Sequence, residues 1–314
     1  MRKGFKFRLV CAITAALVCG GVLAAVPDYT TLICHRGESV DAPENTLPAY
    51  QMAVSRGFGF ECDIYLSADK RVFTFHDSTL TRTTGGANNK SCAEAYWEGE
   101  IENLDVGSWG QWAGSQYAGT RPALLEEVLE LAVDGRYIYV EVKPGAEIVP
   151  YIKEIFDAQT NATPANTLFI SFNENSCKAL KQQMPDYKVF LLKSGSMTSA
   201  NLITKLQTLG VDGVSHAYSS SVVTAEFISA IRSAGFEFHV WTSDDLDTAL
   251  EAFGRGAQTV TTNCGKGVAR RVSGALGESA RDPPDLSLRC GRLRAGRAGA
   301  ASRRHPQRGR RVAA

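Results

Sequence analysis

Short apolar runs rich in β-branched residues alternate along most of the chain with segments whose apolar residues recur at helical spacing. The short runs predict strands, at residues 32–36, 58–66, 72–76, 137–143, 167–172, 188–192, 211–215, 236–242 and 258–262. The longer segments predict helices, at residues 47–57, 122–134, 146–158, 173–184, 198–209, 222–234 and 244–254. Thr46 suits the N-cap of the first helix, with Pro48 in its first turn. This alternation over about eight units predicts an α/β fold, specifically a (β/α)8 TIM barrel.

Nine predicted strands are one more than such a barrel holds, and the turn at 68–71 accounts for the extra one. A parallel crossover needs at least about a dozen residues, whereas only a few separate the second run from the third. We therefore predict that residues 60–67 and 71–76 form an antiparallel hairpin that extends one barrel strand. Folding about residue 69 places His76 opposite Cys62 and level with Glu61 and Asp63.

Residues 77–121 show no strong helical or strand pattern. A stretch of this length without regular structure is usually a functional loop or an insertion. Because it follows the predicted hairpin at the C-terminal rim, we expect a small inserted cap that forms a wall for a substrate. Its aromatic residues are expected to make the cap's own core, and they are Trp97, Trp109, Trp112 and Tyr117.

The two ends of the chain differ in composition from its body. Residues 1–25 join a positively charged start to an apolar run, which predicts a cleaved signal peptide and a secreted or periplasmic protein without a stable membrane span. Residues 270–314 hold twelve Arg and no Lys, and we interpret them as a disordered or non-native tail rather than a basic arm for a polyanion. The predicted barrel, residues 26–269, has a net charge of −12, which argues against nucleic-acid binding.

Cys34 and Cys62 each neighbour a candidate site residue on a predicted strand. Strand alternation points both out of the barrel and under the helices, so we expect buried free thiols although an oxidising destination permits disulfides. The sequence contains no C-x-x-C, which argues against structural zinc.

Three carboxylates share the predicted inward faces of two strands. Alternation puts Glu61 and Asp63 on one side of the first strand and Glu141 on one face of the second. If these faces coincide, the carboxylates meet inside the barrel mouth, where barrel enzymes keep their chemistry. Their mutual repulsion would raise their pKa values, and one hard divalent cation, Mg²⁺ or Ca²⁺, would remove that conflict.

Two histidines and two cationic side chains are predicted at the same rim. His35 and Arg36 follow the first strand, Lys143 shares the face of Glu141, and the hairpin brings His76 to the same level. Arg36 offers a planar fork for a phosphate oxygen, and Lys143 offers a point charge. Two histidines can divide proton transfer between an attacking hydroxyl and a leaving alkoxide. The set indicates metal-assisted chemistry on a phosphate.

Each of these residues has a simpler interpretation when taken alone, as a solvated strand edge, a rim ion pair or a core histidine. Their occurrence together at strand ends favours the site. His216 and His239 lack such company, so core or rim positions are expected for them, with substrate contact left open for His216. Glu44-Asn45-Thr46 is expected to brace the first loop and cap its helix, the alternative being a bond from Glu44 to a site residue.

The motifs around these residues resemble those of the glycerophosphodiester phosphodiesterases. The resemblance covers about residues 31–265, and its motifs are specific in combination. They are His35-Arg36-Gly37, Pro43 to Tyr50, Glu61-Cys62-Asp63, Phe75-His76-Asp77, Thr79-Leu80, Arg82-Thr83-Thr84, Leu125 to Leu129, Val140 to Lys143, Ser171-Phe172-Asn173 and Val240-Trp241-Thr242.

The resemblance implies a barrel of the phosphatidylinositol-phospholipase-C type that hydrolyses a glycerophosphodiester to glycerol 3-phosphate and an alcohol. It implies a cation held by Glu61, Asp63 and Glu141, phosphate held by Arg36 and Lys143, and supporting or rim positions for Glu44, Phe172 and Trp241. His35 and His76 would be the acid–base pair, and we assign His76 as the base and His35 as the acid. The route implied passes through a cyclic phosphate made by the substrate's own glycerol hydroxyl.

One motif departs from the family pattern. The last strand usually ends in Thr-Asp with a proline soon after, whereas this chain has Thr262-Asn263-Cys264-Gly265. We expect an effect on local rim structure and a short or absent closing helix. The rival interpretations are a sphingomyelinase-D-like phospholipase that acts on intact lipids and a secreted binding module that retains only the barrel.

Overall fold

Nine strands alternate with helices through residues 32–269, the part of the chain that the computed structural model describes. The predicted signal segment 1–25 and the Arg-rich segment 270–314 lie outside the described residues. All nine predicted strands are present, and they are β1 (Leu32–Cys34), β2 (Gly59–Leu66), β3 (Val72–Thr74), β4 (Ile138–Val142), β5 (Thr167–Ser171), β6 (Lys188–Lys193), β7 (Gly213–Ala217), β8 (Glu237–Trp241) and β9 (Thr259–Thr262).

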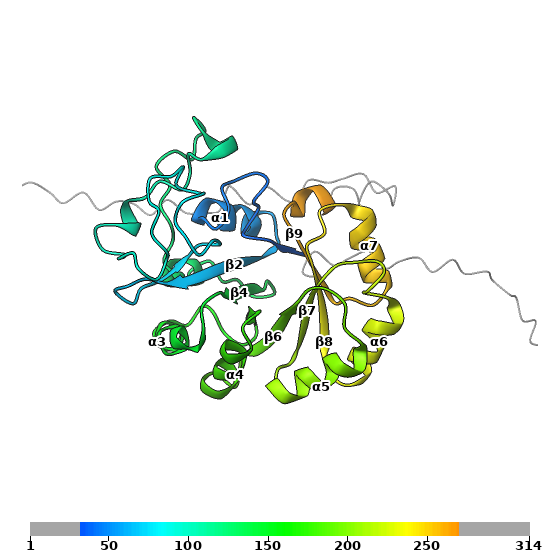
Figure 1. Cartoon of the computed structure of the whole chain (residues 1–314). Helices are drawn as coiled ribbons and strands as arrows, with labels where there is room; N and C mark the ends of the chain where they lie inside the picture. The colour runs from blue at the N-terminus through cyan, green and yellow to red at the C-terminus, as the bar shows by residue number, and fades with distance from the viewer. Residues whose placement is uncertain (1–31, 270–314) are drawn as a thin grey trace, which may run out of the picture. The chain divides into compact units, whose positions relative to one another are not determined.

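Eight of these strands are parallel and close into a barrel. The hydrogen-bonded order is β1-β9-β8-β7-β6-β5-β4-β2, and β1 pairs with β2 to complete the ring. Figure 1 shows the strands at the centre and the helices around them. The predicted (β/α)8 barrel is confirmed.

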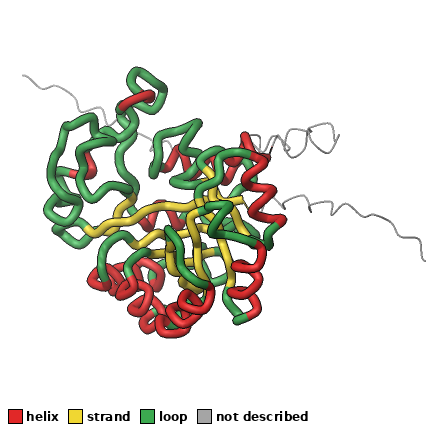
Figure 2. Tube along the Cα trace, turned by 45° about the vertical axis from the view of Figure 1, so that its right-hand side comes forward, coloured by secondary structure: helices red, strands yellow, loops and turns green. Residues whose placement is uncertain are grey.

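The helices lie outside the barrel, as the red segments of Figure 2 show. They are α1 (Leu47–Ser55), α2 (Leu125–Leu129), α3 (Val149–Asp157), α4 (Glu174–Gln183), α5 (Ser199–Leu209), α6 (Ala225–Ser233) and α7 (Leu246–Gly254). Thr46 caps α1 as predicted, accepting the N–H of Ala49, and Pro48 stands in the first turn. A closing helix is present from Gly265 to residue 269, where the described residues end, so of the two expectations, a short or an absent helix, the second does not hold and the first stays a prediction.

Two predicted helices are shorter than the pattern indicated. The prediction of 122–134 was wrong at both ends, because the Glu127 carboxylate accepts the N–H of Leu124 at 2.9 Å and fixes the start of α2. At the other end, the N–H groups of Leu131 and Ala132 bond three residues back, which tightens the chain into turns. The prediction of 146–158 is realised as a 3₁₀ turn at Ala146–Ile148 followed by α3.

The short strand β3 is the antiparallel extension that the turn at 68–71 predicts. It pairs with the C-terminal half of β2, with Ile64 opposite Thr74 and Leu66 opposite Val72. The N–H of Phe75 continues the ladder to the carbonyl of Asp63 at 3.0 Å. This register carries the chain toward a position opposite Cys62 at His76, which confirms the predicted hairpin.

Strand β1 ends at Cys34, two residues earlier than predicted. The backbone of Arg36 has φ 58°, in the left-handed region that ends a strand, and its N–H bonds to the Glu61 side chain instead of a ladder partner. His35 and Arg36 therefore stand in the loop after β1, at the C-terminal mouth of the barrel.

Alternation along the strands separates two apolar layers. The barrel interior is filled by Ile33, Tyr139, Leu168, Ile170, Phe190 and Leu192. The opposite faces pack under the helices in a larger core that contains Cys34 and Cys62. Both are buried free thiols, as predicted. The inward faces of β2 and β4 are therefore those that carry the acidic residues.

Residues 77–121 follow β3 and contain only short elements, the 3₁₀ turns Ile101–Asn103 and Gly110–Trp112. Their apolar side chains, among them Leu80, Trp97 and Ile101, form a separate cluster with Phe73 and Phe75 of the hairpin. Asp69 in the hairpin turn links the hairpin to this segment, because its carboxylate accepts hydrogen bonds from the N–H groups of Trp97 at 2.7 Å and Glu98 at 3.1 Å. We call residues 77–121 the cap.

Two histidines predicted in core or rim positions are core residues. His239 lies inside the barrel, where the Tyr139 hydroxyl is 3.0 Å from its Nδ1. His216 lies outside the barrel wall between Phe227 and Phe238, and its Nδ1 donates to its neighbour's carbonyl at 2.7 Å. Among the helices of residues 32–269, none has the length and apolar character that a bilayer crossing requires.

Candidate active site

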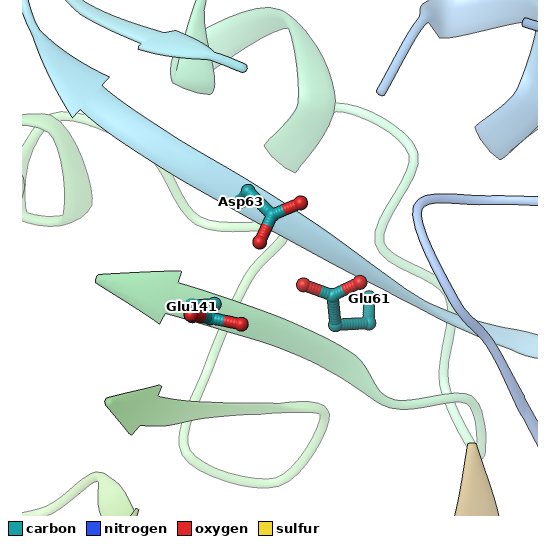
Figure 3. A group of neighbouring side chains, drawn as sticks. All are labelled: Glu61, Asp63 and Glu141. Atoms are coloured by element: carbon teal, nitrogen blue, oxygen red, sulfur yellow. The ribbon is translucent and has the colours of Figure 1, made fainter. Parts of the chain in front are cut away.

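Three carboxylate side chains from β2 and β4 converge inside the barrel mouth (Figure 3). Asp63 and Glu141 are register partners on neighbouring strands, and Glu61 precedes Asp63 by two residues on the same face. One oxygen of each lies within 4.8 Å of the others, and all three side chains are buried. The structure thus brings together the three acids that strand alternation predicts to converge. We call them the carboxylate cluster.

Burial and mutual repulsion disturb the ionisation of the carboxylate cluster. Burial, followed by the charges of Asp63 and Glu141, raises the pKa of Glu61 well above its ordinary value. Burial and Asp63 raise the pKa of Glu141 to about 7. For Asp63 burial acts in the same direction, but Lys143 and Arg36 outweigh it and lower its pKa to about 2. The cluster alone therefore carries less than its full negative charge at neutral pH.

The hydrogen bonds of the cluster leave room for a cation. Lys143 Nζ lies 3.0 Å from Asp63 Oδ1 and 2.8 Å from Glu141 Oε1. The buried Oε1 of Glu61, in contrast, has no hydrogen-bond partner among residues 32–269. Crowded carboxylate oxygens, one of them unpartnered, are the ligands that Mg²⁺ and Ca²⁺ take. The three acids therefore fit a hard divalent cation.

His35 is held at the cluster by a partner from the far end of the chain. Its Nδ1 lies 2.7 Å from Asn263 Oδ1, and its Nε2 lies 4.0 Å from Glu61 Oε2. Burial and then the charge of Arg36 lower the pKa of His35. The expected effect of Asn263 on local rim structure is seen at His35, because β9 ends beside β1 and brings this amide to the imidazole.

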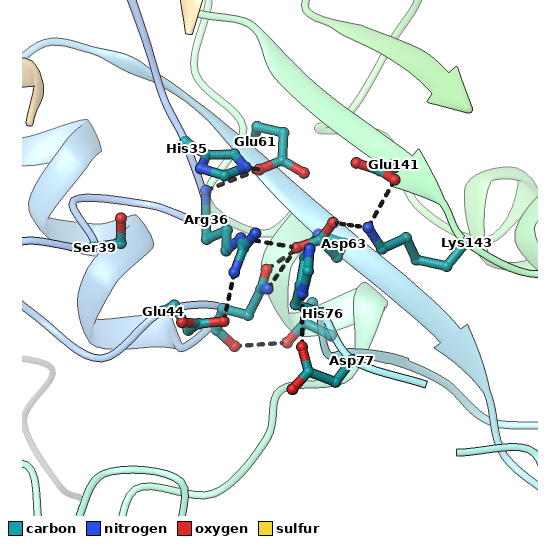
Figure 4. A network of polar contacts seen from close by, with 12 residues as sticks. His35, Arg36, Ser39, Glu44, Glu61, Asp63, His76, Asp77, Glu141 and Lys143 are labelled. Atoms are coloured by element: carbon teal, nitrogen blue, oxygen red, sulfur yellow. Dashed lines mark hydrogen bonds and ion pairs between the residues drawn. The ribbon is translucent and has the colours of Figure 1, made fainter. Parts of the chain in front are cut away.

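His76 is held by its neighbour in the sequence. Its Nδ1 lies 2.8 Å from Asp77 Oδ1, as Figure 4 shows. Asp77 also accepts from Arg82 at 2.7 and 3.0 Å, and these bonds are the main reason why its pKa falls to about 2. An ionised carboxylate only accepts, so the His76 proton sits on Nδ1 and its Nε2 is free for chemistry.

Arg36 and His76 are connected through a continuous chain of charged side chains. Glu44 accepts from Arg36 at 2.8 Å and from both terminal nitrogens of Arg82 at 2.7 and 2.9 Å. Arg82 continues to Asp77, and its guanidinium lies 5.1 Å from the ring centre of Trp109 in the cap. Glu44 thus bonds to a site residue, the alternative that the sequence left open.

Arg36 is positioned to meet an anion as well as to brace the cluster. Its backbone N–H donates to Glu61 at 2.8 Å, and its Nε lies 3.5 Å from Asp63 Oδ2. That buried Nε makes no hydrogen bond within residues 32–269. Together with Lys143, it gives the site two cationic groups beside the carboxylates.

Asn45 bonds directly to the carboxylate cluster, whereas the sequence predicted for it only a part in bracing the first loop. Its Nδ2 donates to Asp63 Oδ2 at 2.8 Å, while its Oδ1 accepts from the N–H of Asp63 and the hydroxyl of Tyr50. The backbone at Asn45 has φ 55°, a conformation in which Asn is enriched. In the sequence, only its place between Glu44 and the helix cap Thr46 pointed to a role for Asn45.

The sequence analysis also did not name Asp77, Arg82 or Asp244 as candidate site residues.

Phe172 and Trp241 form the aromatic part of the rim. They follow β5 and end β8, and their rings meet edge to face with centres 5.7 Å apart. The indole N–H of Trp241 is fixed by the carbonyl of Ser215 at 3.0 Å, whereas Phe172 is half exposed. The pair offers an apolar wall beside the polar cluster.

Comparison with known proteins gives one consistent family. A sequence profile described as the glycerophosphoryl diester phosphodiesterase family matches residues 35–264. A glycerophosphodiester phosphodiesterase of Caldanaerobacter subterraneus subsp. tengcongensis is 28% identical over 231 residues, which are 71% of this chain and 90% of that protein. One from Bacillus altitudinis is 30% identical over 210 residues, 65% of this chain and 82% of that protein. The fold is similar to that of an Oleispira antarctica phosphodiesterase in complex with its product sn-glycerol-3-phosphate, with a TM-score of 0.67, 25% identity, and coverage of 79% of this chain and 97% of that one.

Proposed function

Since this chain belongs to the glycerophosphoryl diester phosphodiesterase family, we propose that it hydrolyses glycerophosphodiesters to glycerol 3-phosphate and an alcohol. Family membership makes it a phosphoric diester hydrolase. The observation that carries the proposal is the buried carboxylate cluster, in which one Glu61 oxygen has no hydrogen-bond partner within residues 32–269. Two histidines flank it, and the Nδ1 atom of each already has a partner.

The cluster and its neighbours divide the work of binding. Glu61, Asp63 and Glu141 would hold one Ca²⁺ or Mg²⁺, which when bound supplies Lewis-acid polarisation of a phosphoryl oxygen. Arg36 and Lys143 bind the remaining phosphate oxygens, because their donors lie beside the cluster and carry the opposite charge. These contacts orient the diester and stabilise the charge that develops on phosphorus.

The first step makes a cyclic phosphate. The glycerol hydroxyl next to the phosphorylated carbon attacks phosphorus, and its proton passes to Nε2 of His76. The bond between phosphorus and the alcohol oxygen breaks, and Nε2 of protonated His35 gives its proton to that oxygen. The alcohol leaves, and the glycerol keeps a five-membered cyclic phosphate.

The second step reverses the proton roles. Water attacks the cyclic phosphate and its proton passes to Nε2 of His35. The newly formed ring bond opens, and His76 returns its proton to the glycerol oxygen. Glycerol 3-phosphate leaves, and both histidines regain their starting protonation states.

The partners of the two imidazoles support this division of roles. His76 is bonded to a carboxylate, which stabilises the imidazolium that forms when His76 takes a proton. His35 is bonded to a neutral amide and lies beside the Arg36 charge, so its protonated form gives up the proton readily. We therefore assign His76 as the first base and His35 as the first acid.

The leaving alcohol contacts the rim rather than the cluster. The Phe172–Trp241 pair and the cap border the mouth, and we propose that they select among alcohols. The signal-like segment 1–25 supports a secreted or periplasmic location for the reaction.

A metal-titrated assay tests the proposal. Purified protein is stripped with a chelator and then supplied with Ca²⁺ or Mg²⁺ in the presence of glycerophosphocholine, -ethanolamine, -inositol or -glycerol. We expect cation-dependent release of glycerol 3-phosphate and a loss of about 100-fold or more in His35→Ala and His76→Ala. Hydrolysis of intact sphingomyelin or lysolipid instead would indicate the sphingomyelinase-D-like phospholipase, and tight binding without turnover would indicate a binding module.

A further inference from the structure

Asn263, in the loop after β9, makes three hydrogen bonds of 2.7 Å, two to Asp244 and one to His35. Its backbone N–H donates to Asp244 Oδ1 at 2.7 Å, and its side-chain Nδ2 donates to Asp244 Oδ2 at 2.7 Å. Its Oδ1 then faces Nδ1 of His35 at 2.7 Å. Asp244 thus bonds both the backbone N–H and the side-chain NH₂ of Asn263, and the side-chain oxygen of Asn263 is left facing the imidazole.

These contacts decide which way the amide faces. A carboxylate only accepts hydrogen bonds, so the atom of Asn263 that meets Asp244 is the NH₂ group and the atom that meets His35 is the oxygen. The Ser39 hydroxyl, which donates to the same oxygen at 3.3 Å, agrees with this orientation. An amide oxygen in turn requires N–H at His35 Nδ1, and the exchangeable proton of the imidazole therefore belongs to Nε2.

We propose that Asp244 and Asn263 form a positioning pair that aims Nε2 of His35 at the leaving oxygen of the substrate. The proposal rests on the hydrolase activity proposed above and extends it to two residues outside the reacting groups. Asp244 follows β8, Asn263 follows β9 and His35 follows β1, so the pair and the histidine come from the C-terminal ends of three neighbouring strands.

The backbone already places His35 but does not orient its ring. The N–H of His35 bonds to the carbonyl of Thr262 at 2.7 Å, which fixes the position of the residue beside β9. Rotation about the side-chain bonds still allows the two ring nitrogens to exchange places. The bond to Asn263 selects one arrangement, with Nε2 on the side of Glu61 and the phosphate-binding groups.

Two substrates that differ only in the leaving group test the pair. Glycerophosphocholine loses an alkoxide that needs a proton, whereas the p-nitrophenyl ester of glycerol phosphate loses a phenolate that departs without one. For Asn263→Ala we expect kcat/KM on glycerophosphocholine to fall about 10- to 100-fold and kcat/KM on the p-nitrophenyl ester to fall far less. Equal losses on both esters, with an unchanged melting temperature, would overturn the proposal.

An exchange of the two side chains gives a second, independent test. Asn263→Asp alone sets two carboxylates face to face and removes the side-chain donor to Asp244, so we expect it to lose activity. Adding Asp244→Asn restores a side-chain donor at 244 and keeps an acceptor toward His35, so the double variant should regain at least about 3-fold in kcat/KM over Asn263→Asp, and it should stay below the wild type because a carboxylate holds the His35 proton more tightly than an amide does. A double variant no better than Asn263→Asp counts against the pair, and this comparison decides the matter should Asn263→Ala fail to fold.

Ser39→Ala is the matched control, because Ser39 contacts the same Asn263 oxygen but not the imidazole. It should keep both kcat/KM values within about 2-fold. Wild-type protein that releases no glycerol 3-phosphate from either ester, with Ca²⁺ or Mg²⁺, would reject the hydrolase itself. If the wild type hydrolyses both esters and Asn263→Ala lowers kcat/KM equally on both, only the positioning pair would be rejected.

Discussion

The substitution Glu141→Gln should stabilise the cation-free protein while it removes activity. Burial and the neighbouring charge of Asp63 raise the pKa of Glu141 from an ordinary value of 4.5 to about 7. At roughly 1.4 kcal/mol for each tenfold change in proton affinity, the ionised carboxylate costs the fold about 3 kcal/mol. Glutamine keeps the shape and an oxygen for Lys143 but carries no charge, so it removes that cost.

The effect has a defined direction with pH. Between about 4.5 and 7 the folded protein retains a proton on Glu141 that the unfolded chain has lost, so its stability falls as pH rises through this window. Below about 4.5 both states are protonated and the variant has no advantage. Above about 7 the whole difference of about 3 kcal/mol is present, and Glu141→Gln should be the more stable protein.

Urea unfolding in a chelator, at one pH near 4.5 and one near 8, measures this difference through tryptophan fluorescence. Glu237→Gln is the control with the opposite sign, because the bond from His239 lowers the pKa of Glu237 to about 2 and its charge stabilises the fold near neutrality. Saturating Ca²⁺ at about 100 times its dissociation constant should add about 2.7 kcal/mol to the wild type and much less to Glu141→Gln. A variant that is less stable than the wild type in chelator near pH 8 would show that the Lys143 ion pair outweighs the crowding.

Three further substitutions probe the rest of the structure. Arg82→Lys should lower kcat/KM about 10-fold without changing the melting temperature by more than a few degrees, because a lysine cannot bond both Glu44 and Asp77. Tyr139→Phe should cost about 1–3 kcal/mol in urea unfolding and leave kcat/KM unchanged, because it removes the hydroxyl partner of Nδ1 of buried His239 inside the barrel and touches none of the groups proposed to react. Phe172→Ala should raise KM about 5-fold for glycerophosphocholine but not for glycerophosphoglycerol, since we propose that its half-exposed ring contacts the leaving alcohol.

The local half of the site could be predicted because its geometry is set by short-range rules. Alternation puts Glu61 and Asp63 on one face whatever the rest of the chain does. The turn at 68–71 leaves too few residues for a crossover, so the hairpin and its register with Ile64 opposite Thr74 follow. Glu141 was also predictable, because a parallel barrel aligns the C-terminal ends of its strands.

The ends of elements were harder to predict because side chains decide them. Strand β1 stops where the backbone of Arg36 turns to bond the Glu61 carboxylate, and that acceptor lies 25 residues along the chain. Helix α2 begins where the Glu127 carboxylate accepts the backbone N–H of Leu124. The pattern of apolar residues, from which the helix was predicted, gives no information on this hydrogen bond. In both places a specific hydrogen bond overrides the propensity of the segment.

The two histidines show why roles are harder to predict than positions. His76 finds its carboxylate in the next residue, so the pair is visible in the sequence as His76-Asp77. His35 finds its amide 228 residues away, and that contact exists only because the closed barrel sets β9 beside β1. The departure at Asn263 is visible in the sequence, but only the fold shows that it changes the partner of a reacting imidazole. An imidazole that faces an amide loses its proton more easily than one that faces a carboxylate, and our proposal of His35 as the first acid and His76 as the first base rests on this contrast.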